Sequence, residues 1–211
     1  MEKFCTLFIV ILLAACSTTQ YEASTLIQSI DSTKLNDVKI NIDTTGVILA
    51  SQANERLYKL HHNHAEVQEM FNNVAKRFGF QITNEEQAEY RLNVSDVKPD
   101  GGECIQGLSS FNKKASFTLS LITLGVLPAT NGYCIQVNAE LFYRQEVYGE
   151  LGDELIPLAL FQANNGRVDV IAGANEVNNY QRIVTIEDEA RALEISIVFL
   201  FEDMIRKGAF E

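Results

Sequence analysis

The stretch Asn63-His-Ala-Glu-Val-Gln-Glu-Met-Phe-Asn-Asn-Val-Ala-Lys-Arg-Phe-Gly79 decides the fold, because it is the clearest helix in the sequence. Its apolar residues recur every three or four positions and form one stripe: Val67, Met70, Phe71, Val74 and Phe78. Asn63 and Glu66 have the spacing of a capping box, and Gly79 is typical of a left-handed C-terminal cap. Since a helix with one apolar face must bury it, we expect this helix to lie on a sheet.

Segments on both sides of this helix alternate between apolar and polar residues, as half-buried strands do. Val38, Ile40 and Ile42 precede it, and residues 88–94 and 117–121 follow it. The longest alternation runs over residues 133–143 and predicts a fourth strand. Between the apolar runs 155–161 and 168–171, the sequence Asn164-Asn165-Gly166 predicts a hairpin turn.

A second helix is predicted from Thr185 to about Gly208. Thr185 serves as its cap, and Glu187, Asp188 and Glu189 follow in the first turn, where negative charge is favoured. Residues 197–201 are apolar all round, so we expect a loop or a partner to cover a second face. These elements predict an α+β fold in which two helices pack on one face of a mostly antiparallel, four- to five-stranded sheet. Residues 37–211 are expected to form this single domain.

The first sixteen residues have the composition of an export signal. Lys3 precedes an apolar run over residues 4–13, which is too short to cross the ~30 Å hydrocarbon core as a helix. The run ends in Leu13-Ala14-Ala15-Cys16, which resembles the lipobox of bacterial lipoproteins. The alternative is an ordinary secretory signal with a cysteine at position 16 by chance.

The lipoprotein resemblance implies cleavage before Cys16, with residues 1–15 removed and acyl chains such as palmitate carried on Cys16. In the enterobacterial form of that family, a residue other than Asp after the cysteine implies transfer to the outer membrane, and Ser17 fits that pattern. Residues 16–36 are polar after the cysteine and are expected to act as a tether.

The formal net charge of −11 argues against nucleic acid as a partner, because phosphate binding needs clustered Lys and Arg. It also disfavours electrostatic adsorption to anionic lipid. Membrane attachment is therefore expected to come from the lipid on Cys16, since several acyl chains give stable anchoring.

Cys104 and Cys134 are the two cysteines that remain after Cys5 and Cys16 are assigned to the export segment. In an oxidising periplasm we expect them to form a disulfide. The bond would close a loop of about 30 residues and contribute about 3 kcal/mol. Two buried thiols are the alternative.

All three histidines of the chain, His61, His62 and His64, fall within four residues. Imidazoles this close could bind Zn²⁺ or Cu²⁺. The alternative, which we favour, is a solvated loop and helix cap, because metal sites usually draw ligands from separate elements. The three residues are kept as candidate metal ligands.

No catalytic constellation is evident in the sequence, so we expect a protein that is not an enzyme and needs no cofactor. The acidic run at 187–189 is explained by helix capping, and Glu85-Glu86 by a solvated loop. There is no nucleophile elbow, phosphate loop or dinucleotide glycine pattern.

The most apolar part of the mature chain is residues 115–130. One interpretation is a core strand that runs into a hydrophobic turn. The other is an exposed tip that binds lipid or protein, formed by Ile122, Leu124, Val126 and Leu127.

A second resemblance rests on Arg77-Phe-Gly-Phe80, at the end of the first helix, and on Ala88-Glu-Tyr-Arg-Leu92, at the start of the next strand. This arrangement is similar to that of the lipopolysaccharide-assembly and curli-secretion lipoproteins. It implies an outer-membrane lipoprotein on the periplasmic face that aids envelope assembly or secretion through contact with an envelope protein. The alternative functions are a carrier of a small hydrophobic ligand or lipid, and a metal-binding lipoprotein.

Overall fold

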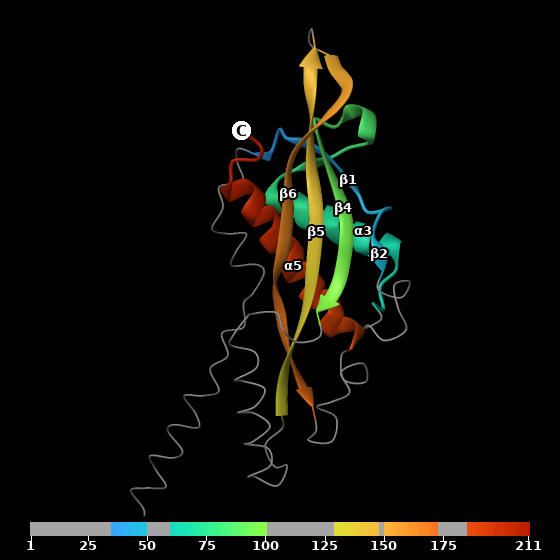
Figure 1. Ribbon diagram of the computed structural model, residues 1–211, viewed down its shortest axis with the longest axis vertical. Helices are drawn as coiled ribbons and strands as arrows, with labels where there is room; N and C mark the ends of the chain where they lie inside the picture. The colour runs from blue at the N-terminus through green and yellow to red at the C-terminus, as the bar shows by residue number, and fades with distance from the viewer. Residues whose placement is uncertain (1–34, 50–59, 101–128, 148–149, 173–184) are drawn as a thin grey trace, which may run out of the picture.

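The computed structural model describes residues 35–49, 60–100, 129–147, 150–172 and 185–211 (Figure 1). Its elements, in chain order, are β1 (Lys39–Asp43), β2 (Ile48–Leu49), α3 (His64–Phe78), β3 (Gln81–Ile82), the 3₁₀ helix η3 (Glu85–Gln87), β4 (Tyr90–Asp100), β5 (Ala129–Val147), β6 (Glu150–Ala172) and α5 (Ile186–Arg206).

The strands form one sheet in the order β3-β1-β4-β5-β6, and the short β2 pairs with β4. β1 runs parallel to β3 and β4, whereas β4, β5 and β6 are antiparallel neighbours. The sheet is therefore mixed, which corrects the expectation of a mostly antiparallel one. The physical reason is α3, which carries the chain back between β1 and β4, as the connection between parallel strands requires.

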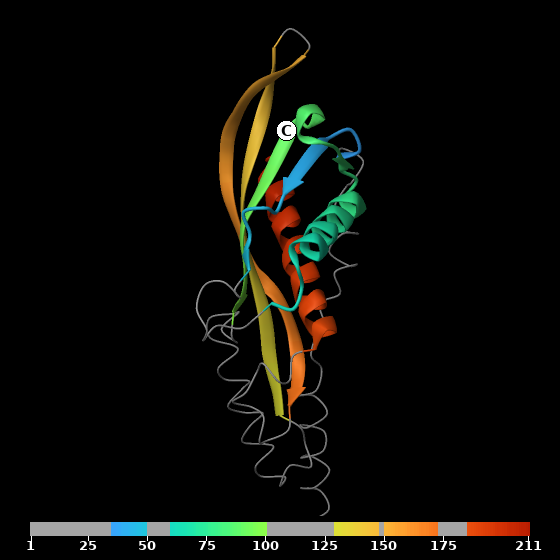
Figure 2. The same ribbon diagram turned by 90° about the vertical axis from the view of Figure 1, so that its right-hand side faces the viewer.

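Both described helices lie on the same face of the sheet (Figure 2). Helix α5 packs on β5 and β6, α3 packs beside β1 and β3, and the two helices contact each other. The α+β class and the one-sided placement of the helices are thus confirmed.

Helix α3 has the caps that its sequence predicts. Asn63 accepts a hydrogen bond from the Glu66 backbone N–H, and Glu66 Oε2 accepts one from the Asn63 N–H at 2.8 Å. Gly79 ends the helix with φ 101°, a left-handed conformation that side chains disfavour. Val67, Phe71, Val74 and Phe78 are buried, so the predicted stripe faces the core.

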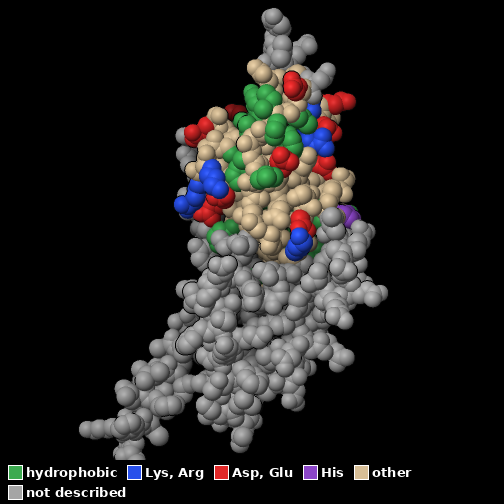
Figure 3. Space-filling model, in the orientation of Figure 1, with side chains coloured by type: hydrophobic (Ala, Val, Ile, Leu, Met, Phe, Trp, Pro, Cys, Tyr) green, Lys and Arg blue, Asp and Glu red, His purple; other side chains and the backbone are tan. Residues whose placement is uncertain are grey.

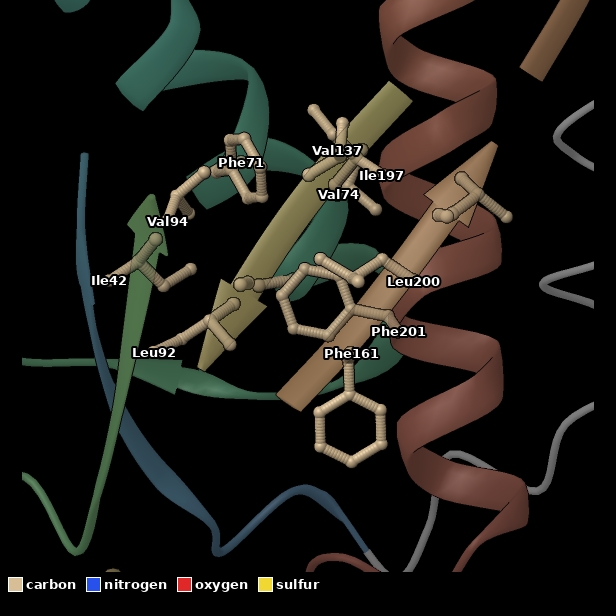
Figure 4. Close-up of a cluster of buried hydrophobic side chains, with 14 of the residues drawn as sticks. Ile42, Phe71, Val74, Leu92, Val94, Val137, Phe161, Ile197, Leu200 and Phe201 are labelled. Atoms are coloured by element: carbon tan, nitrogen blue, oxygen red, sulfur yellow. The ribbon is translucent and has the colours of Figure 1, made fainter. Parts of the chain in front are cut away.

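The core lies between the sheet and the two helices, where side chains from both layers point toward one another (Figure 4). Phe201 of α5 lies at its centre, with ring centroids 5.8 Å from Phe78 and 5.5 Å from Phe80. Leu200 and Ile197 are also fully buried. Because α5 packs against the sheet and also against α3, most of its all-round apolar segment is buried within the chain. Helix α3 thus covers part of the second face, for which a loop or a partner was expected.

Strand β6 is continuous where the sequence predicts a hairpin turn. Gly166 pairs with Ile135 and Ala163 with Val137, so β6 has one extra residue there and forms a bulge. The predicted turn at Asn164-Asn165-Gly166 is therefore wrong, because pairing with β5 along its whole length overrides local turn chemistry. Ser196 of α5 donates a hydrogen bond of 2.5 Å to the Ile135 carbonyl at this bulge.

Candidate interaction surface

The outer face of the sheet, opposite the helices, presents a group of apolar side chains over β5 and β6 (Figure 3). We call this group the apolar corner, and it comprises Phe142, Pro157, Leu158 and Leu160. Cross-strand pairs in an antiparallel sheet share a face, and Leu160 pairs with the polar Glu140 rather than with a core residue. Pro157 pairs with Phe142 in the same way, and Leu158 is the extra residue of a second bulge beside them.

The apolar corner contains Leu160, the most exposed large apolar side chain among the described residues. Leu160 is 79% exposed and Leu158 is 46% exposed, while Phe142 is half-buried. Burying a leucine side chain fully is worth about 1.5–3 kcal/mol, and none of the described elements covers Leu160. Clustered exposed apolar residues of this kind mark interaction sites.

β6 stands at the edge of the sheet, yet this edge is poorly suited to accept another strand. Bulges interrupt its pairing with β5 near Leu158 and again before Gly166. Pro157 has no backbone N–H to donate to a further strand. Bulges and proline are the devices by which natural sheets protect their edges. The apolar corner is therefore suited to contact through side chains rather than through added main-chain hydrogen bonds.

Arg91 dominates the charged part of the outer face. It donates to Asp43 Oδ2 at 2.7 Å, to Asn93 Oδ1 at 2.8 Å, and to Glu85. Burial alone would raise the pKa of Asp43, but hydrogen bonds from Thr45 and then from Arg91 outweigh it and lower that pKa below its usual value. Arg91 is thus committed to these three acceptors.

Glu140 lies between this network and the apolar corner. It pairs across the sheet with Asn93 on one side and with Leu160 on the other. In the part of the chain that the structure describes, it forms no ion pair. Arg144, four residues further along β5, donates to the Glu86 carbonyl at 3.3 Å, which holds its guanidinium toward η3. The half-buried carboxylate beside Leu160 is therefore left without a cation.

The most enclosed charged group among the described residues is Glu189 of α5, which is fully buried. Its carboxylate accepts hydrogen bonds from the backbone N–H groups of His61 and His62, at 2.7 and 3.1 Å. The Nδ1 atoms of the same histidines lie 2.9 and 2.6 Å from it. This His–Glu clasp fixes the residues before α3 to the first turn of α5.

Glu189 is the site residue that sequence reasoning missed, since a place in an acidic first turn already explained it. A signal was present, because Glu189, Leu193 and Ile197 are four residues apart and share the buried stripe of α5. A carboxylate on an apolar stripe needs partners, and donors elsewhere in the chain are the natural source.

The predicted histidine cluster does not converge on one point. His61 and His62 each direct Nδ1 at Glu189, whereas His64 is the first residue of α3. Within the described ranges, no group of three or more His, Cys, Asp or Glu residues could hold a metal ion.

Cys134 is fully buried and disulfide-bonded, and its partner lies outside the described residues. The pairing with Cys104 therefore stays a prediction. Cys16, the strand predicted at 117–121, and the predicted binding residues Ile122, Leu124, Val126 and Leu127 also lie outside the described residues. Neither of the helices that the structure describes has the length and apolarity to pass through a bilayer.

Comparison with protein families and with curated proteins does not identify a family for this chain. No family model matches this chain, and no curated protein matches it.

Proposed function

We propose that this protein is an outer-membrane lipoprotein on the periplasmic face, anchored through Cys16, that acts without catalysis by binding another envelope protein. The apolar corner is the observation that carries the second half of this proposal. It supplies an exposed apolar surface that the described elements leave uncovered, with Leu160 at its most exposed point. The lipobox carries the first half.

The sheet topology supports a link between the anchor and this surface. Ile40 pairs with Tyr90, Tyr90 with Tyr143, and Tyr143 with Ile156, so all four residues lie at one end of the sheet. The described chain enters β1 at this end, which is also where β5 meets β6. A tether of 18 residues (17 to 34) separates Cys16 from Leu35 and could span at most about 60 Å. The apolar corner is thus near the domain's point of attachment.

Site-specific photo-cross-linking in intact cells tests the proposal. A photoreactive amino acid replaces Leu160 in the full chain, and a matched one replaces Glu69, which is exposed on α3 in the opposite layer. We expect a discrete protein adduct from position 160 and none from position 69. The adduct should diminish when Cys16→Ala prevents lipid attachment.

Two results would contradict the proposal. Protein adducts absent from position 160, together with lipid co-purified with the chain, would favour a carrier. Normal maturation and membrane fractionation of Cys16→Ala would refute the lipid anchor.

A further inference from the structure

We propose that the partner seated on the apolar corner is a basic amphipathic helix, whose apolar face covers Leu158 and Leu160 and whose Lys or Arg pairs with Glu140. This inference rests on the proposed function and specifies the chemistry of the partner at that same surface.

Glu140 determines the charge of the occupant. It is the direct cross-strand neighbour of Leu160, and such pairs have Cβ atoms about 4.5–5.5 Å apart. Any surface that covers Leu160 therefore removes water from the Glu140 carboxylate. Burying an ionised carboxylate without a partner is costly, and no described residue supplies a cation. The occupant must bring one.

The same charge argument disfavours the other occupants. A second copy of this chain would bring its own Glu140 and a net charge of −11 to the contact, and like charges across an interface cost affinity. An anionic lipid surface is repelled for the same reason.

Backbone geometry favours a helix over an extended peptide. Strand addition needs a regular edge, and β6 has bulges on both sides of residues 159–163 and Pro157 next to them. A helix packs on a sheet face mainly through side chains and needs no free strand edge, and α5 packs in this way on the other face of these two strands.

The test uses the full mature chain and a synthetic helical peptide with leucines on one face and lysines flanking them. The comparison peptide has glutamate in place of every lysine. Fluorescence anisotropy of the labelled peptides gives the dissociation constants at low and high salt. We expect binding of the lysine peptide only, weakened about 10-fold by Leu160→Asp, since central apolar contacts dominate such interfaces.

The charge variants make the test specific to this site. Glu140→Gln should weaken the lysine peptide several-fold and reduce the salt dependence of its binding, as loss of an interfacial ion pair does. Glu69→Gln removes the same charge from the opposite layer and should leave the dissociation constant unchanged. Circular dichroism melts check that all three variants are folded.

The inference fails if both peptides bind equally, if Glu140→Gln behaves like Glu69→Gln, or if Leu160→Asp binds normally. It also fails if sedimentation shows a dimer that Leu160→Asp dissolves, or if the chain binds phosphatidylethanolamine vesicles through Leu160. Protein cross-links from position 160 without binding of the lysine peptide would remove this inference and leave the proposed function standing.

Discussion

Two apolar runs of this chain, residues 197–201 of α5 and 155–160 of β6, look alike in the sequence and end in opposite environments. Phe201 is fully buried between the sheet and α3, whereas Leu160 is 79% exposed on the outer face. Both lie on long elements of the same layered domain. The difference is that α5 has neighbours on two sides, while the described helices cover β6 on one side only. An apolar run thus predicts burial only when the elements that cover it are known.

Truncation of Phe201 should reveal the largest difference in stability between the two apolar runs. Phe201→Ala should reduce the free energy of unfolding by about 3–5 kcal/mol, because it leaves a cavity between α3, α5 and the sheet. Urea denaturation followed by circular dichroism measures the change. Leu160→Ala is the matched control and should change stability by less than about 0.5 kcal/mol. Equal losses of unfolding free energy in the two variants would show that the two apolar runs do not differ in burial.

Removing the buried carboxylate should have the next largest effect. Glu189→Gln should destabilise the protein by about 2–4 kcal/mol, since the amide cannot accept all the donors of His61 and His62. Glu187→Gln is its control, because Glu187 is exposed in the same helical turn. Thermal melts of both variants provide the measurement, and similar melting temperatures would show that the clasp adds little.

A smaller effect should follow from acidification of the outer face. The pKa of Asp43 is lowered in the folded state, so its contribution is present above its ordinary pKa of 3.8 and is lost as pH falls through the folded value. Asp43→Asn should remove about 1 kcal/mol at pH 7 and flatten the pH dependence of stability below about pH 4. Urea midpoints at pH 7, 5 and 3 for both proteins measure this, and parallel pH profiles would contradict it.

Substitution of Leu160 should change the stability of the domain least and its binding to a partner most. Leu160→Asp should change the free energy of unfolding by less than about 0.5 kcal/mol, because the Leu160 side chain is mostly in water. It should nevertheless abolish cross-linking to a partner from a photoreactive residue at position 158. Retained cross-linking together with normal stability would show that the apolar corner is ordinary surface.

The sequence predicted α3 and α5 well because their signals are local. Caps and stripes lie within one helix, as Asn63, Glu66 and Gly79 show. The direction of β1 was not predictable from alternation, which is identical in parallel and antiparallel strands. The turn at 164–166 was predicted wrongly, because turn residues also occur at bulges.

The candidate surface was harder to find than the fold. The position of the apolar corner depends on which strand stands at the edge of the sheet and on which face the helices cover. Neither can be read from the local pattern of apolar and polar residues. The clasp depends on residues 127 and 128 positions apart in the chain. Sequence reasoning placed the binding surface at 122–127, which the structure does not describe, and had no means of choosing β6.

The place of α5 after all the described strands has a consequence for when the domain can fold. This helix supplies Phe201 to the centre of the core and Glu189 to the clasp, yet it is synthesised after every strand on which it packs. Until α5 has been synthesised, β5 and β6 lack the described helix that packs on their inner face, and contacts between distant segments form slowly. The described domain therefore closes its core only after α5 has been made. For an exported protein, as we propose this one to be, that delay leaves the polypeptide unfolded while it passes through a translocation channel.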